Sequence, residues 1–446
     1  MQKGENVTGL IARILAVVAL LCFGAEARAQ NLPIVFVHGN GDSAALWHTT
    51  IWRFESQGYD PARLFAVDMA APVAPGDDTK TEENRSTSTD QAAQLAAAVT
   101  RVLIATGAEK VALVGNSRGA NTIRNYIRFG GGHAHVALAV LAGGVNHGVF
   151  ASTSTSLNSE FNGGGRFMTR LNQGSEVHPG VRFVTLRSDK LDKYAQPTGE
   201  FIGRPGQPTG IGYDAPQLAG AENIVIPGLD HREIAFHARA FAEIFSAVAG
   251  RAPESTAITP EAAPVLDGLV AGYANGAPTN QPVVGATVEV FETDPSTGAR
   301  RGDAVHRATI RSDGRWGPFT AKPDVAYEFA VAATGYPTHH VYRTPFPRSS
   351  RYVHLHLRPA DPKLKDAAAA VAMTRPRGYF GHGRDTFTID GRVPDGVNEG
   401  VPGASAAAMA IAEPGKAVVV VFNDEKLVVR SEAPAGGRVA LAEFHH

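Results

Sequence analysis

Short apolar runs alternate with segments of helical periodicity from residue 33 to residue 248, and this alternation is the strongest constraint on the fold. The run at residues 33–38 is Pro-Ile-Val-Phe-Val-His, which is typical of a strand buried on both faces. Strands that alternate with helices form a mostly parallel sheet with helices on both faces. We expect strands at residues 33–38, 64–67, 111–114, 136–141, 181–186 and 223–226, and helices at residues 88–105, 120–129 and 232–248.

A second region begins after Gly250, where the sequence changes character. Residues 251–264 are predicted to be a linker. Beyond them, runs of alternating polarity are separated by turn signals, a pattern that indicates an all-β sandwich. Trp316, Tyr327 and Phe329 are expected to pack in its core rather than to form a binding face. The mature chain thus divides into residues 30–250, the linker and a β-sandwich region at 265–446, and we leave open whether a break near residue 360 separates two subdomains.

The N-terminus has the pattern of an export signal. A Lys and an Arg precede a short apolar run at residues 14–23, and small residues follow at 27 and 29. We predict that residues 1–29 are a signal peptide and that the mature protein is secreted or periplasmic. Cys22, the single cysteine, lies within this segment, which excludes a disulfide or a thiol nucleophile in the mature chain. No later apolar run is long enough for an integral membrane segment.

A Gly-Asn-Ser-Arg-Gly sequence at residues 115–119 lies between an expected strand and an expected helix. A Gly-x-Ser-x-Gly sequence occurs by chance in many chains, but at a strand-to-helix turn it is the pattern of a nucleophile elbow. The glycines let the strand and the helix approach closely, and the serine hydroxyl then projects above the edge of the sheet. Ser117 is therefore the candidate nucleophile.

A serine nucleophile needs a base, and the base needs an acid that orients it. His231 follows the last expected strand and opens the last expected helix, so it lies at the same edge of the sheet as Ser117. Asp189 directly follows the strand at residues 181–186 and is the preferred acid. Asp192 is the competitor, and we disfavour it because it lies further from the end of that strand.

The reaction also needs donors for an oxyanion and a wall for the substrate. The backbone N–H groups of Asn40, after the first strand, and of Arg118, after the nucleophile, are expected to be the donors. Two long loops at residues 151–174 and 194–219 lie beside the site, and such loops often form lids or substrate walls. The candidate substrate-binding residues are three apolar members of the first loop, Phe161, Phe167 and Met168.

Together these motifs resemble an α/β-hydrolase of the small secreted bacterial lipase type. The resemblance includes the Val-His-Gly loop at 37–39, the Val-Asp pair at 67–68, the Ala-Asn-Thr sequence after the elbow and the final Gly-x-x-His. It implies an α/β-hydrolase fold, a catalytic domain at residues 30–250 and a triad in the chain order Ser117, Asp189, His231. The chain departs from the family at Asn116, where lipases commonly carry His. Its outline is similar to that of two-domain lipases with a C-terminal β domain.

Composition limits the binding partners. The 42 Lys and Arg residues nearly balance the 43 Asp and Glu residues, so there is no basic excess for nucleic acid. No motif implies a cofactor or a metal, and His354 and His356 are expected to be surface residues of a strand rather than ligands. The near-zero net charge and the apolar loop residues favour a hydrophobic ester substrate.

The resemblance and the site residues lead us to expect a secreted serine carboxylic-ester hydrolase, a lipase or esterase that works through an acyl-enzyme. The nearest alternative is an extracellular hydrolase of polyesters or other polymer esters. Amide or thioester hydrolysis would use the same residues. The rival from another class is a non-enzymatic surface-binding protein in which the β domain is the functional part, and an intact triad argues against it.

Overall fold

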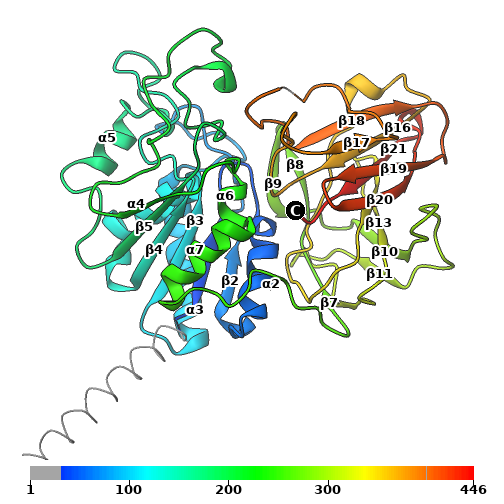
Figure 1. Cartoon of the computed structure of the whole chain (residues 1–446), viewed down its shortest axis with the longest axis horizontal. Helices are drawn as coiled ribbons and strands as arrows, with labels where there is room; N and C mark the ends of the chain where they lie inside the picture. Colours follow the sequence, from blue (N-terminus) through cyan, green and yellow to red (C-terminus); the bar gives the residue numbers. More distant parts are fainter. Residues whose placement is uncertain (1–31, 398) are drawn as a thin grey trace, which may run out of the picture.

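Two halves of the chain lie side by side, an α/β half that ends with Ala249 and a β half after it (Figure 1). The structure is a computed structural model that describes residues 32–397 and 399–446, so the predicted signal peptide lies outside the described residues. In the first half, six parallel strands form one sheet in the order β2-β1-β3-β4-β5-β6. These strands are β1 (Ile34–Val37), β2 (Leu64–Val67), β3 (Val111–Asn116), β4 (Val136–Ala142), β5 (Arg182–Arg187) and β6 (Glu222–Val225).

Helices cover both faces of this sheet, as the alternating pattern predicts. Apolar side chains of α2, α6 and α7 form one core against one face, and those of α3 and α4 form a second core against the other. The helices of this half are α2 (His48–Ser56), α3 (Ser88–Thr106), α4 (Arg118–Phe129), α5 (Arg166–Asn172), α6 (Glu233–Phe236) and α7 (Ala238–Ala249). Short 3-10 turns lie at Ala44–Trp47, Pro61–Arg63, Gly132–Ala134, Glu200–Ile202, Pro362–Leu364 and Pro434–Gly436.

The predicted strands and helices of this half are confirmed, with three differences. α5 lies in the segment at residues 151–174 that we expected to be a loop. α2 has no counterpart among the expected helices, because its sequence begins His-Thr-Thr and only the packing of its apolar side chains makes it a stable helix. The helix expected at residues 232–248 is in fact α6 and α7. His237 has an extended backbone between them, and its ring accepts a hydrogen bond from the N–H of Arg239 at 3.1 Å, which caps α7.

The second half is built from β-sheets, as expected. Its largest sheet has seven strands in the order β11-β10-β13-β14-β21-β16-β18, and three smaller sheets have the orders β12-β7, β15-β8-β9 and β17-β19-β20. The strands are β7 (Val265–Leu266), β8 (Val270–Ala274), β9 (Ala277–Pro282), β10 (Thr287–Glu292), β11 (His306–Thr309), β12 (Phe319–Thr320), β13 (Tyr327–Ala332), β14 (Thr338–Arg343), β15 (Leu355–His356), β16 (Ala369–Thr374), β17 (Phe387–Ile389), β18 (Ala406–Ile411), β19 (Ala417–Phe422), β20 (Glu425–Arg430) and β21 (Arg438–Glu443).

Two hydrophobic cores share the seven-stranded sheet. One contains Trp316, Tyr327 and Phe329, which confirms that these aromatic residues pack inside. The other is formed largely by residues 369–444. β21 joins the two parts because it pairs in parallel with both β14 and β16. The break near residue 360 falls between these two cores, and the division into subdomains stays a prediction.

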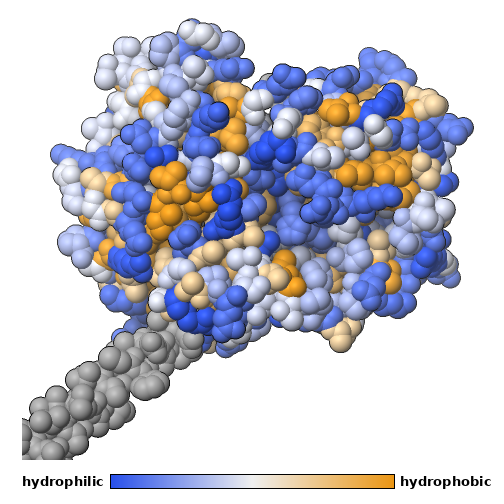
Figure 2. Space-filling model, viewed as in Figure 1, coloured by the Kyte–Doolittle hydropathy of each residue, from blue (hydrophilic) through white to orange (hydrophobic). Residues whose placement is uncertain are grey.

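The second half holds the loops that follow β1 and β2. His354, which we expected on the surface, is buried, and its Nε2 lies 2.9 Å from Oδ2 of Asp68, the residue after β2. The side chain of Asn280 donates to the carbonyl oxygens of Met69 at 3.0 Å and Asp42 at 2.8 Å. Figure 2 shows mainly hydrophilic residues along the line where the halves meet on this face. Polar contacts therefore fix the second half against the carboxyl ends of β1 and β2.

The start of α4 packs directly on the end of β1, and Gly119 makes this approach possible. A Cβ atom at Gly119 would lie 2.5 Å from the carbonyl oxygen of Val37 and 2.6 Å from that of His38. Both are backbone atoms of the end of β1 and the loop after it, so neither can move aside without shifting this loop. The contact therefore sets how closely the first turn of α4 approaches the sheet.

We expect Gly119→Ala to lower the free energy of unfolding by about 1–2 kcal/mol, measured by urea denaturation. Overpacking costs about 1–3 kcal/mol, and the better helix propensity of Ala returns at most about 1 kcal/mol. Gly76→Ala is the control, because the nearest atom to its added Cβ is a side-chain oxygen of Glu82 at 3.6 Å. Equal stability of the two variants would contradict the close approach.

Candidate active site

Ser117 lies in a sharp turn between β3 and α4. Its φ of 55° and ψ of −126° form a backbone conformation that non-glycine residues rarely adopt. Gly115 and Gly119 flank the turn, and a Cβ at Gly115 would lie 3.0 Å from the backbone of Gly119. The backbone N–H of Ser117 donates to the carbonyl oxygen of Ala142 at 3.1 Å, which ties the turn to β4. The turn thus has the geometry expected of a nucleophile elbow.

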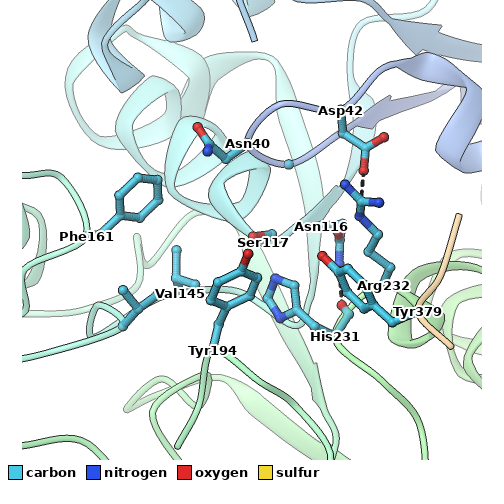
Figure 3. A pocket seen from close by; sticks show the side chains of 12 residues that line it. Asn40, Asp42, Asn116, Ser117, Val145, Phe161, Tyr194, His231, Arg232 and Tyr379 are labelled. Carbon is cyan, nitrogen blue, oxygen red and sulfur yellow. Dashed lines mark hydrogen bonds and ion pairs between the residues drawn. The ribbon is translucent and has the colours of Figure 1, made fainter. Parts of the chain in front are cut away.

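His231 lies beside this turn, and one of its ring nitrogens is free for chemistry. Its Nδ1 lies 2.8 Å from Oδ1 of Asp192, and both side chains are 2% exposed. Its Nε2 has no hydrogen-bond partner among the described residues, although it is buried. The side chain of Asn116 donates to the carbonyl oxygen of His231 at 3.1 Å, so the residue before Ser117 also positions the histidine. Figure 3 shows the imidazole ring next to Ser117.

The structure corrects the preference for Asp189 as the acid beside His231, because Asp192 occupies that position. Asp189 instead accepts hydrogen bonds from the backbone N–H groups of Leu191 at 3.0 Å and Gly228 at 3.2 Å. After β5 the chain makes a turn in which the N–H of Asp192 donates to the carbonyl oxygen of Asp189 at 3.3 Å. This turn carries Asp192 back toward the histidine, so its distance along the chain from the strand end does not matter.

The loop and the helix start that carry the expected oxyanion donors both adjoin Ser117. A Cβ at Gly39 would lie 2.8 Å from the Cβ of Ser117, so the loop after β1 touches the turn directly. Asn40 follows in that loop, and its Oδ1 accepts a hydrogen bond from the N–H of Ala74 at 2.8 Å, which fixes the loop. The N–H of Arg118 belongs to the first turn of α4, where N–H groups have no partner inside the helix.

The side chain of Arg118 is turned away from this site into the protein. Its Nη2 lies 2.7 Å from Oε2 of Glu160, and the two side chains are 1% and 2% exposed. It also donates to the carbonyl oxygen of Pro72 at 3.2 Å. Burial lowers the pKa of this guanidinium below its usual range, although Glu160 opposes the shift. Arg118 can therefore contribute its backbone N–H to the site, while its side chain joins α4 to the loop at residues 151–174.

Ser117 and His231 open into a pocket of about 130 Å³. Phe161, one of the three predicted substrate-binding residues, lines it together with Val145 and Val149. Phe167 and Met168 are not among the described residues that line it. Met168 is fully buried, because α5 packs on α4 and turns this side chain toward Asn121. In the segment at residues 151–174, Phe161 therefore lines the pocket, whereas α5 does not.

The other end of the pocket is polar, and the sequence patterns did not point to its residues. Asp42, Tyr194, Arg232 and Tyr379 line it, and Nε of Arg232 lies 3.1 Å from Oδ2 of Asp42. Figure 3 shows Arg232 and Tyr379 on the opposite side of Ser117 from Phe161. Burial raises the pKa of Tyr379 well above its ordinary value, so its phenol keeps its proton. Arg232 directly follows His231 and Asp42 lies two residues after Asn40 in the sequence, but no sequence signal indicates Tyr379.

The parallel sheet, the turn at Ser117 and the histidine after the last strand define the first half as an α/β-hydrolase. Residues 31–180 match the family described as Lipase (class 2), and residues 267–360 match the family described as Lipase C-terminal domain. The chain therefore combines a region that matches class 2 lipases with a later region that matches the lipase C-terminal domain. Residues 361–446 lie outside both matches.

Solved structures of lipases are similar to this chain at low identity. Lipase B of Aspergillus fumigatus is 15% identical with a TM-score of 0.37, over 51% of this chain and 54% of that one, so the chain spans about half the length of that lipase. The mature lipase BlEst2 of Bacillus licheniformis is 18% identical with a TM-score of 0.36, over 49% of this chain and 92% of that one. The family assignment rests on the two sequence matches and not on these likenesses.

The described residues contain neither a candidate membrane span nor a candidate metal cluster. Within residues 32–397 and 399–446, no helix combines the length and the apolar composition needed to cross a bilayer. In the same residues, no three side chains of His, Cys, Asp or Glu are grouped so that they could hold a metal ion.

We expect Glu160→Gln to lower the free energy of unfolding by about 3–5 kcal/mol, because it leaves the buried guanidinium of Arg118 without a counter-charge. Glu222→Gln is the matched control. Glu222 lies 2.8 Å from Arg182, but these side chains are 53% and 52% exposed, so its loss should cost less than about 1 kcal/mol. Guanidinium denaturation of both variants measures the difference, and a similar cost in the two would show that the Arg118–Glu160 pair is not coupled as the structure indicates.

Proposed function

We propose that this protein is a secreted serine carboxylic-ester hydrolase of the lipase type that acts on hydrophobic acyl esters through Ser117, His231 and Asp192. The observation that carries the proposal is the arrangement of these three residues. Ser117 lies in the strained turn, and His231 lines the same pocket with Nε2 unpaired and Nδ1 2.8 Å from Asp192. A nucleophile, a base and an orienting acid in this order are what acyl transfer requires.

In the proposed reaction, Oγ of Ser117 attacks the ester carbonyl carbon while Nε2 of His231 takes the hydroxyl proton. The N–H groups of Asn40 and Arg118 donate to the oxyanion that forms, at a helix N-terminus that favours negative charge. The bond to the alcohol then breaks as His231 returns the proton to the leaving oxygen. Water repeats both steps on the acyl-enzyme, which releases the acid and restores Ser117.

Asp192 takes the part that the sequence pattern favoured for Asp189. Its carboxylate accepts the Nδ1–H of His231, which leaves Nε2 deprotonated and available as the base, and it stabilises the imidazolium once that forms. Asp192 also accepts a hydrogen bond from the N–H of Tyr194 at 2.9 Å. The carboxylate is therefore held in place by the loop that also supplies one wall of the pocket.

The apolar end of the pocket supports a hydrophobic acyl group as the substrate. Val145, Val149 and Phe161 line this end, and none of them carries a charge or a hydrogen-bonding side chain. Lipid esters are the substrate that we favour, and polymer esters share the same chemistry at the reacting carbonyl. Secretion follows from the predicted signal peptide at residues 1–29.

Ser117→Ala should abolish the hydrolysis of p-nitrophenyl esters, with a loss of about 10⁴-fold or more in kcat, because no other group is placed to attack. Initial rates on esters from acetyl to palmitoyl, measured with wild type and variant side by side, test this. A wild-type optimum at long chains would support a lipase, and an optimum at short chains would support an esterase or a polymer-ester hydrolase. Equal rates in both proteins would exclude Ser117 as the nucleophile.

Asp192→Asn should lower kcat by about 10⁴-fold, the size of effect seen when the acid of a Ser-His-Asp triad loses its charge. Asp189→Asn is the matched control, since the same atom is changed three residues away. It should have a far smaller effect, because Asp189 contacts backbone N–H groups and not His231. A larger loss of kcat in Asp189→Asn than in Asp192→Asn would instead identify Asp189 as the acid.

A further inference from the structure

A residue of the second half forms part of the pocket that contains Ser117 and His231. Tyr379 lies in the connection between β16 and β17, and it lines this pocket (Figure 3). Both family matches end before this connection, since the second one ends at residue 360. The site is therefore completed by a part of the chain that neither matched region includes.

Backbone hydrogen bonds hold Tyr379 beside His231. Its N–H donates to Oδ2 of Asp230 at 2.8 Å, and Asp230 directly precedes His231. Its carbonyl oxygen accepts hydrogen bonds from Arg375 at 2.6 Å and from Arg384 at 3.2 Å. These contacts involve only the backbone of Tyr379, so they would survive the loss of its side chain.

The two arginines also bind the carboxylates that flank His231. Glu233 lies 2.9 Å from Arg375 and 2.8 Å from Arg384. Asp230 is fully buried, and both guanidinium groups lie within 3.6 Å of its carboxylate. Buried carboxylates need such counter-charges, because an unpaired buried charge costs several kcal/mol. The connection that carries Tyr379 is therefore fixed to the segment that carries the histidine.

Two cations fix the ring of Tyr379 itself. Nζ of Lys193 lies 4.0 Å from the ring centroid, and Cζ of Arg232 lies 5.1 Å from it. Nζ of Lys193 also donates to the carbonyl oxygen of Gly403 at 2.9 Å. Cation–π contacts of this kind contribute about 0.5–2 kcal/mol each. The ring is thus packed against two cations, and it forms a wall of the pocket that can limit the size of a substrate.

The position of Tyr379 relates it to one part of an ester. In the proposed reaction, His231 must reach the oxygen of the departing alcohol, so the alcohol part lies on the histidine side of Ser117. Tyr379 and Arg232 are on that side, whereas Phe161 is on the other (Figure 3). We propose that Tyr379 is a specificity-determining residue, supplied by the second half, that limits the size of the alcohol part of the ester. This inference rests on the proposed function.

The test compares kcat/KM for four esters, the methyl and cyclohexyl esters of butyric and octanoic acid, by titration of the released acid. Tyr379→Ala should raise the cyclohexyl-to-methyl ratio by roughly tenfold, the lower end of what a change in the size of a binding pocket does to discrimination between substrates. It should leave the octanoate-to-butyrate ratio unchanged. Tyr379→Phe should keep both wild-type ratios, because the ring sets the limit. A ratio of two substrates does not depend on the fraction of folded enzyme.

Phe161→Ala is the matched control, an aromatic residue removed from the opposite wall. It should change the octanoate-to-butyrate ratio and leave the cyclohexyl-to-methyl ratio as in wild type. An active, Ser117-dependent wild type whose alcohol ratio is unchanged by Tyr379→Ala would overturn this inference alone. A shift of the acyl ratio in Tyr379→Ala would also overturn it. A wild type inactive on all four esters would overturn the proposed function and the inference with it.

Discussion

The left-handed backbone at Ser117 is the constraint on which the arrangement of the site depends. Ser117 has a φ of 55° in a turn that a strand, a helix and a neighbouring loop all approach closely, and each of them does so at a glycine. Gly115 lets β3 meet α4, Gly119 lets α4 meet β1, and Gly39 lets the loop after β1 touch Ser117. The same close contacts that surround the strained turn bring the loop of Asn40 and the N-terminus of α4 to the serine. Strain and preorganisation are thus two consequences of one packing arrangement.

The sequence predicted most of the first half because its signals are local. Buried strands and amphipathic helices are visible in the order of apolar residues, and parallel strands place their carboxyl ends at one edge. Ser117 and His231 could therefore be assigned to the same edge from the sequence alone. The preference for Asp189 over Asp192 was wrong. A hydrogen-bonded turn after β5 decides which carboxylate faces the histidine, and the distance of a residue from the end of the strand does not predict that turn.

The polar end of the pocket could not be predicted, because it is assembled by contacts between distant parts of the chain. Tyr379 follows a strand of the second half, and no motif around it suggests a place beside Ser117. Met168 is the opposite case, a predicted substrate-binding residue that does not reach the pocket. It lies in the predicted loop and is apolar, yet α5 turns it into the core. Composition identifies a candidate wall, but packing decides which of its side chains reaches the substrate.

The buried charges at the junction of the halves argue against treating the second half as an accessory. Without Arg375 and Arg384, Asp230 and Glu233 would lose the cations nearest to them, and each uncompensated buried charge costs several kcal/mol. His231 lies between these carboxylates in the sequence, so any relaxation that relieves them would move the proposed base. A surface-binding β domain attached to a self-sufficient hydrolase would not need such a junction. The geometry favours one site built by both halves, in which the second half helps to hold the histidine and shapes the pocket.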